Sequence, residues 1–335
     1  MKYYISASTD KGNRKEGNQD SLLVRKLSSA NGEIVLAVLC DGMGGLQHGE
    51  LASACVVSLF SKWGYSRLSE LSLSPMSSEV IEKDWKRLVS EANSRIRSFG
   101  IRKGGRIGST MTALLLTQNT FFLLNIGDSR AYRLNIAGIS QLTRDHTLIA
   151  QEIARGNMTQ EQAEHSKIRH MLTRCIGVEE HAIPDFTCGR VFPGDSFILC
   201  SDGFYHKISS QDVWNTIFFG RSMDQSEMKR RELVLMETDM FRGESDNISV
   251  ITIHSHPDAD PAQASGSMAD SVFPASEMNG TNGDDTITEM MDDTSPTEDP
   301  DKAANGPFEP MRFAVLKDIT FLAPADPRAL AVLTD

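Results

Sequence analysis

The chain has 335 residues, of which 40% are hydrophobic, and a formal net charge of −11. Most of this charge comes from residues 257–310, which contain thirteen acidic residues and one basic residue, so residues 1–256 are nearly neutral. A body without excess positive charge argues against a nucleic-acid partner, and its apolar content is enough for a sizeable core.

The sequence gives no sign of export or membrane insertion. One lysine and a short mixed run follow the first residue, and no run approaches the roughly 18 apolar residues of a spanning helix. The five cysteines are odd in number and include no Cys-x-x-Cys pair, which indicates neither a disulfide framework nor a zinc ribbon. We therefore expect a cytoplasmic protein with no membrane partner.

Short apolar runs rich in β-branched and aromatic residues predict at least eight strands. They cover residues 3–7, 22–27, 34–39, 111–116, 121–126, 131–134, 197–200 and 248–253. Only a few residues separate several of them, as at 118–120 and 127–129, which favours antiparallel pairing over parallel strands joined by helices.

Helical periodicity interrupts the strands in four places. One helix begins near Gly49, a second places apolar residues three or four apart from Ile81 to Phe99, and later helices cover 212–219 and 227–241. A helix with one apolar stripe needs a sheet face to cover. The pattern predicts an α+β fold, with two packed antiparallel sheets and helices on the outside, over residues 1–256.

Two further segments stand apart from this pattern. Residues 146–177 are polar and helix-prone, which is equally consistent with a flap over a site and with an ordinary surface hairpin. Residues 257–310 have the composition of a disordered acidic linker. Residues 311–335 are more apolar, and they could dock as a strand or a short helix on this protein or on a partner, or remain an idle terminus.

Aspartates recur at the ends of the apolar runs. Asp41 follows the strand at 34–39 and opens a glycine-rich turn, and four more aspartates lie at comparable places. These are Asp20, Asp128, Asp202 and Asp246. Clustered carboxylates without a cation would repel one another and take up protons, and oxygen ligands suit Mg²⁺ or Mn²⁺. The residues alone leave open whether the aspartates are dispersed or bind metal.

Seven sequence blocks carry a more specific signal, and they occur in a fixed order. They cover residues 10–20, 41–45, 108–113, 127–130, 142–146, 201–203 and 245–249. Together they resemble the protein phosphatase 2C family, the PPM-type metal-dependent serine/threonine phosphatases, in its bacterial form. The resemblance extends from residue 1 to about 254.

The resemblance implies an αββα sandwich with two Mn²⁺ or Mg²⁺ ions in a cleft. By the family pattern Asp41 bridges both ions and Gly42 contributes its carbonyl oxygen. Asp202 and Asp246 complete the ligands, and Asn247 supports them. Asp128 matches a position of a third metal site.

The remaining roles implied by the resemblance concern water and substrate. Asp20 would hold metal-bound water, and Arg14 would clamp the substrate phosphate. Met43 stands where animal members have a histidine proposed as the general acid, so protonation of the leaving group would fall to water.

The resemblance further implies hydrolysis of phosphoserine and phosphothreonine in proteins by a hydroxide that bridges the two metals, in opposition to a serine/threonine kinase. Phosphoproteins, a cognate kinase and a tail-binding protein are the expected partners. A catalytically silent binding module of the same fold is the alternative. A nucleotide-binding protein built around residues 42–45 is a third hypothesis. The chain argues against it, because these residues lack the Lys-Ser/Thr ending of a phosphate loop.

Overall fold

The computed structural model describes residues 1–29, 32–44, 48–74, 77–164, 166, 168–218, 225–257 and 321–323. The chain divides into two compact units. One comprises residues 1–258 and 314–335, and the other, residues 259–313, lies wholly outside the described residues. Beyond Pro257, the expected acidic linker therefore also lies outside them.

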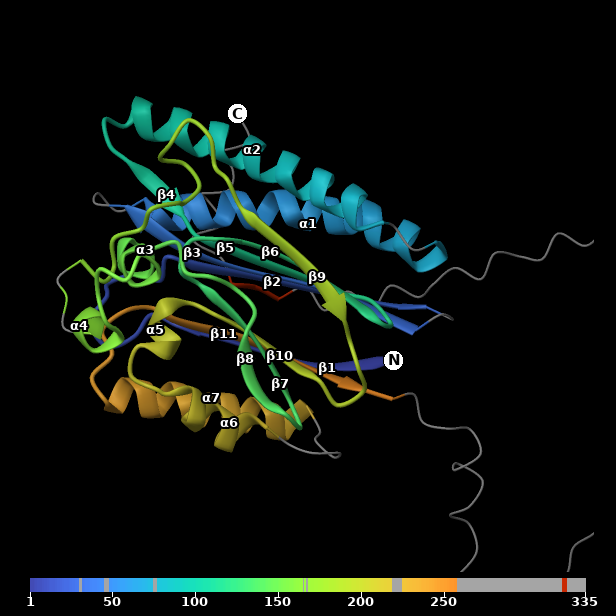
Figure 1. The fold of residues 1–335 in the computed structure, drawn as a ribbon. Coiled ribbons are helices and arrows are strands. Elements are labelled where there is room, and N and C mark those ends of the chain that lie inside the picture. Colours follow the sequence, from blue (N-terminus) through green and yellow to red (C-terminus); the bar gives the residue numbers. More distant parts are fainter. Residues whose placement is uncertain are drawn as a thin grey trace, which may run out of the picture. The chain divides into compact units, whose positions relative to one another are not determined.

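Two antiparallel sheets form the centre of the first unit (Figure 1). The first sheet has the strand order β1-β11-β10-β7-β8, with bounds Lys2–Asp10, Ile248–His256, Ser196–Cys200, Arg130–Asn135 and Gly138–Gln141. The second has the order β12-β2-β3-β5-β6-β9, with bounds Phe321–Ala323, Asp20–Ser29, Gly32–Gly44, Met111–Leu116, Thr120–Ile126 and Asp185–Arg190, and β4, Ile107–Ser109, pairs with β3.

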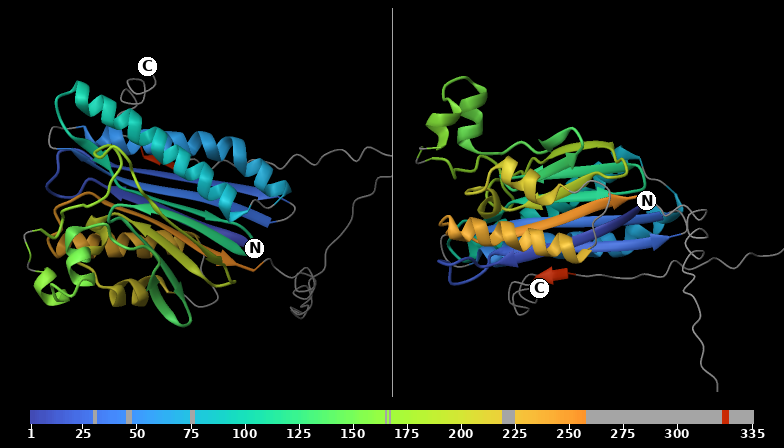
Figure 2. Two further views of the ribbon diagram at one scale, coloured as in Figure 1. Left: turned by 45° about the horizontal axis from the view of Figure 1, so that its top comes forward. Right: turned by 90° about the horizontal axis from the view of Figure 1, so that it is seen from below.

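Helices cover the outer face of each sheet (Figures 1 and 2). The second sheet is covered by α1, Gly49–Leu73, and α2, Ser78–Arg102, while α6, Ser210–Ile217, and α7, Gln225–Phe241, cover the first. The predicted αββα sandwich is confirmed. In the described part of the chain, every helix is too short or too polar to cross a membrane.

Alternation along the strands divides the core into layers. Leu22 and Val24 of β2 lie between the sheets, whereas Leu23 packs in the cluster under α1 and α2. The two-residue period of a strand sends neighbouring side chains to opposite faces, so a strand apolar at every position is buried on both. In the helical layer, Trp85 of α2 meets Phe60 and Trp63 of α1 edge-on, with ring centroids 5.6 Å apart in both pairs.

The sheet register brings the aspartates to one end of the sandwich. Asp20 begins β2 and pairs directly opposite Asp41 of β3. In the other sheet Asp202 lies two residues after the end of β10, and Asp246 lies two residues before the start of its antiparallel neighbour β11. Because paired antiparallel strands place the end of one beside the start of the next, all four carboxylates gather at the same edge.

Several short elements are absent from the predicted pattern. The sequence did not predict β8 and β9, because their residues are mostly exposed or half-buried and show no apolar run. The segment expected as a flap contains α3, Leu148–Ala154, and α4, Gln160–Glu164. α5, Asp202–Tyr205, is a single turn after β10.

The C-terminal segment contributes one short strand. Phe321–Ala323 pairs antiparallel with residues 22–24 of β2, at the edge of the second sheet. The rest of the segment at 311–335 lies outside the described residues, so its role as a docking peptide stays a prediction. An added edge strand satisfies backbone groups that β2 would otherwise present to solvent.

The β12–β2 pairing predicts slow amide exchange in residues 321–323 of the full chain, because hydrogen bonds to β2 protect backbone amides. Truncation after His256 should in turn speed exchange in β2. β7, an inner strand of the other sheet, is the matched control and should not change. Hydrogen–deuterium exchange with mass spectrometry measures all three. Unprotected amides at 321–323, with no effect of truncation on β2, would contradict the pairing.

Candidate active site

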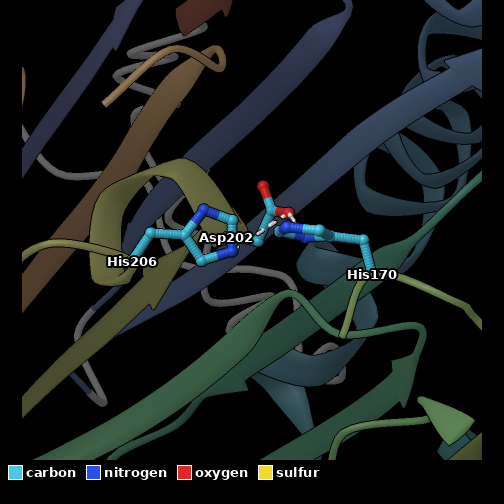
Figure 3. Close-up of side chains that lie close together, drawn as sticks. All are labelled: His170, Asp202 and His206. Atoms are coloured by element: carbon cyan, nitrogen blue, oxygen red, sulfur yellow. Dashed lines mark ion pairs between the residues drawn. The ribbon is translucent and has the colours of Figure 1, made fainter. Parts of the chain in front are cut away.

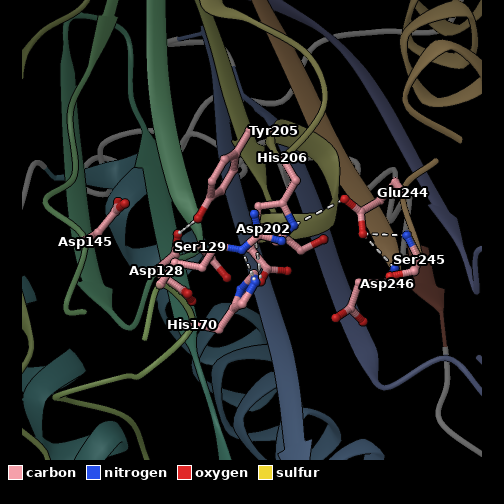
Figure 4. Close-up of polar contacts among 12 residues, drawn as sticks. Asp128, Ser129, Asp145, His170, Asp202, Tyr205, His206, Glu244, Ser245 and Asp246 are labelled. Carbon is pink, nitrogen blue, oxygen red and sulfur yellow. Dashed lines mark hydrogen bonds and ion pairs between the residues drawn. The ribbon is translucent and has the colours of Figure 1, made fainter. Parts of the chain in front are cut away.

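A cavity of about 530 Å³ opens at the end of the sandwich where the aspartates gather. Its lining includes Asp41, Asp128, Asp202 and Asp246, together with residues 170–172 of the expected flap. Figure 4 shows four of these side chains, Asp128, His170, Asp202 and Asp246. A separate cavity of about 360 Å³ lies between the end of α1 and the β5–β6 turn, and none of the described residues that line it carries a carboxylate. The acidic cavity is therefore the candidate for chemistry.

Asp41 and Gly42 are fixed by the neighbouring strands. The backbone N–H of Asp41 donates to Oγ1 of Thr110 at 2.9 Å, and the N–H of Thr110 donates to the carbonyl of Asp41 at 2.8 Å. A Cβ on Gly42 would lie 2.1 Å from the carbonyl oxygen of Gly49, so only glycine fits there. Burial, followed by the charges of Asp20 and Asp202, raises the pKa of Asp41 well above its usual range.

Asp20 is one of the most deeply buried acidic groups of the site, with 2% of its surface exposed. Its Oδ2 accepts a hydrogen bond from the Ser201 hydroxyl at 3.0 Å, while Oδ1 has no partner within the described part of the chain. Burial, with a smaller contribution from the charges of Asp202 and Asp246, raises the pKa of Asp20 to about 7.

Asp202 lies between two imidazoles (Figure 3). Its Oδ2 is 3.4 Å from Nε2 of His206 and 3.9 Å from Nδ1 of His170, and its Oδ1 has no partner among the residues described. Burial raises the pKa of Asp202, although the two histidines act against that shift. Burial would lower the pKa of His206, but its hydrogen bond to Glu244 and the charge of Asp202 raise it.

Asp246 and Asn247 hold the loop at residues 11–19 against the site. The N–H of Gln19 donates to Oδ1 of Asn247 at 2.9 Å, and Nδ2 of Asn247 donates to the carbonyl oxygens of Lys11 and Gly17. Asn247 thus supports the loop that precedes Asp20. Its neighbour Asp246 forms an ion pair with a lysine of this same loop.

That ion pair comes from Lys15, whose Nζ lies 2.8 Å from Oδ1 of Asp246. Burial alone would lower the pKa of Lys15, but the hydrogen bond to Asp246 and the nearby carboxylates raise it. Arg14, predicted to clamp phosphate, is exposed, and no hydrogen bond or ion pair joins it to any described residue. The sequence reading missed Lys15, although it stands beside Arg14 in the same block.

Asp128 lies on the β6–β7 turn and is 7% exposed. Its carbonyl oxygen accepts a hydrogen bond from the Tyr205 hydroxyl at 2.9 Å. Burial, then the charges of Asp202 and Asp145, raises the pKa of Asp128 to about 7. Arg130, two residues further along the chain, pairs with Asp145 at 2.6 Å, which is a structural role.

Comparison with known proteins agrees with this geometry. Residues 10–237 match the protein phosphatase 2C family. The chain is 30% identical to a putative protein phosphatase 2C-type of Streptococcus pyogenes over 253 residues, which cover 75% of this chain and 96% of the relative.

The chain belongs to the protein phosphatase 2C family. Two solved structures extend the likeness. The S. agalactiae serine/threonine phosphatase is 26% identical, with a TM-score of 0.64 and coverage of 76% of this chain and 100% of that one. The catalytic domain of the phosphatase PstP in complex with two manganese ions is 26% identical, with a TM-score of 0.60 and coverage of 76% and 99%. The protein is therefore a serine/threonine protein phosphatase of the PPM type, and hence a hydrolase.

The cavity of this phosphatase fits divalent cations. Asp20 and Asp202 each keep a buried oxygen without a partner in the described part of the chain. Such orphaned carboxylate oxygens are costly unless a cation or water satisfies them. Burial, with a further contribution from neighbouring carboxylates, raises the pKa of Asp41 and Asp202, and a divalent cation would offset this cost. The predicted ligands offer only oxygen atoms, which suit Mg²⁺ and Mn²⁺.

In the metal-free phosphatase, the raised pKa of Asp20 predicts that stability falls as pH rises. The folded protein keeps the proton up to about pH 7, whereas the unfolded chain releases it near 3.8, so the free energy of unfolding decreases across that window. Asp20→Asn removes this ionisation and should flatten the curve of Tm against pH in chelator-treated protein. Glu237→Gln, which removes an exposed carboxylate on α7 outside the cavity, is the control. Equal slopes for wild type and Asp20→Asn would show that Asp20 is not responsible.

Proposed function

We propose that this phosphatase hydrolyses phosphoserine and phosphothreonine in proteins with two divalent cations, Mn²⁺ or Mg²⁺. The cations would be held by Asp41, the Gly42 carbonyl, Asp202 and Asp246. The observation that carries the proposal is the convergence of buried carboxylates from both sheets on one cavity. Support also comes from the related PstP domain, whose structure contains two manganese ions.

Within this site the cations would supply Lewis-acid chemistry, which activates water as the nucleophile and neutralises phosphate charge. The chain's own part is positioning. Asp41 is fixed through Thr110, and Asp20 lies opposite it in the β2–β3 register. The unpaired Oδ1 of Asp20 is available to accept a hydrogen bond from water and so orient it. Direct attack by water needs no nucleophilic side chain.

Substrate binding is assigned to the loop at residues 11–19. Arg14 is exposed and makes no hydrogen bond or ion pair with the described residues, and the planar fork of an arginine matches phosphate oxygens in pairs. Lys15 is instead paired with Asp246, so it is a poorer candidate for binding the substrate phosphate. Met43 lines the cavity and has no proton to give, so we propose that water protonates the leaving group.

The physiological setting follows from the reaction. An enzyme that removes phosphate from serine and threonine opposes a kinase that adds it, so the proposed partners are phosphoproteins and a cognate serine/threonine kinase. Asp128, at the same cavity, is the proposed contributor to a third, weaker cation. A partner for the C-terminal segment is also proposed.

Asp41→Asn and Asp246→Asn should nearly abolish turnover of a phosphopeptide, because each removes a charged cation ligand without changing side-chain volume. Turnover at saturating Mn²⁺, cation affinity by calorimetry and Tm should be measured on the same preparations. Asp84→Asn, which removes an aspartate charge outside the cavity, should retain wild-type turnover. Near wild-type rates in either cavity variant would refute the ligand assignment.

Arg14→Ala should lower kcat/KM on phosphopeptides by a factor that corresponds to about 2 to 4 kcal/mol of transition-state binding, since it removes one or two charge-assisted hydrogen bonds. Its Mn²⁺ affinity should not change, because the guanidinium contacts no cation ligand in this structure. The exposed Arg97 of α2 provides the matched control, Arg97→Ala. An unchanged kcat/KM for Arg14→Ala would reject the clamp.

A further inference from the structure

His170, Asp202 and His206 place three potential ligand atoms within 4.8 Å of one another at the mouth of the cavity (Figure 3). Asp202 begins α5 and His206 directly follows it. The two residues are four apart, so they lie on one face of that turn. His170 comes from the flap segment, thirty-two residues earlier in the sequence. Its ring lies edge-on to that of His206, with centroids 5.0 Å apart.

We propose that these three residues form a cation site of their own, which takes a borderline divalent metal such as Zn²⁺ or Co²⁺ and ties the flap to α5. Two imidazoles and a carboxylate are a common zinc ligand set, whereas Mg²⁺ prefers oxygen ligands only. The donor set therefore differs from the all-oxygen set proposed for the phosphatase centre. The proposal shares Asp202 with that centre, but its cation chemistry is separate.

His206 is already oriented as a metal ligand. Its Nδ1 lies 3.3 Å from Oε2 of Glu244, and its Nε2 is directed toward Asp202 (Figure 4). Glu244 is itself fixed, because its Oε1 accepts the backbone N–H groups of Ser245 and Asp246 at 2.6 and 2.8 Å. A carboxylate on one imidazole nitrogen is the usual way in which proteins aim the other nitrogen at a metal.

Asp202 has an oxygen for each site. Its Oδ2 faces both imidazoles, while its buried Oδ1 has no partner among the described residues. A carboxylate can bridge two cations through its two oxygens. Asp202 can therefore serve the imidazole site with Oδ2 and the phosphatase centre with Oδ1.

His170 is the movable member of the group, because its side chain is half exposed whereas that of His206 is largely buried. The exposed Arg169 donates from Nε to Nε2 of His170 at 2.7 Å, which leaves the proton of a neutral ring on Nδ1. Cation binding through Nδ1 must move that proton to Nε2 and break the Arg169 contact. The bound cation would then hold the flap against the cavity.

Zinc titration of the full chain tests the site. With Mg²⁺ in excess to fill oxygen sites, calorimetry should show Zn²⁺ binding at least tenfold weaker in His170→Asn than in wild type. Arg169→Ala should bind Zn²⁺ at least as tightly as wild type, since it frees the second ring nitrogen. His181→Asn, which removes an exposed histidine outside the group, is the matched control and should behave as wild type.

A second readout identifies the ligands directly. Pulsed EPR of the Co²⁺-loaded chain should detect imidazole nitrogen in wild type and a reduced nitrogen signal in His170→Asn. His206→Asn disturbs the buried contact with Glu244, so the folding of this variant should be checked by thermal melting. If His206→Asn unfolds, the comparison of wild type with His170→Asn is sufficient. Equal Zn²⁺ affinity and equal nitrogen signals in wild type and His170→Asn would overturn the proposal.

The outcomes also separate this site from the proposed function. Mn²⁺-dependent turnover by wild type without any effect of His170→Asn on Zn²⁺ binding would overturn the imidazole site alone. If His170→Asn loses Zn²⁺ affinity as expected but the wild type shows no Mn²⁺-dependent turnover, the imidazole site would be supported and the proposed function overturned.

Discussion

The burial of several carboxylates beside one another is the constraint on which the rest of the structure depends. Asp20, Asp41, Asp128 and Asp202 lie at one end of the sandwich, where little water screens their charges. Burial, with the charges of neighbouring carboxylates, raises the pKa of each of them, so ionising all four in the folded chain is costly without a counter-charge. Divalent cations remove that cost, and the same cations supply the chemistry that phosphate hydrolysis requires.

The scaffold keeps this unfavourable cluster in place through close backbone packing. Gly42 and Gly203 both lie where a side chain cannot fit, since a Cβ at Gly203 would be 2.1 Å from the carbonyl oxygen of Asn247. Thr110 and Asn247 then fix the strand end and the loop around the ligands. The free energy gained by burying apolar residues on both faces of the sheets offsets the electrostatic cost of holding carboxylates together at the end of the sandwich.

The sequence predicted most of the sandwich because its strands are long apolar runs and α2 has a clear helical stripe. It did not predict β9, whose mixed exposure at a sheet edge leaves no periodic signal. The aspartates were found because each lies at the end of an apolar run and in a block that resembles the family. Lys15 and His170 were missed for another reason: their partners lie far away in the sequence, and only the folded chain brings them to Asp246 and Asp202.

Anomalous scattering from crystals of the full chain grown with Mn²⁺ tests the central claim most directly. The account predicts two manganese peaks in the cavity, about 3.5 to 4 Å apart, as in two-metal hydrolases. Asp41, the Gly42 carbonyl, Asp202 and Asp246 should be their protein ligands. An empty cavity at saturating Mn²⁺, or peaks held by other residues, would contradict the assignment of this carboxylate cluster as the catalytic centre.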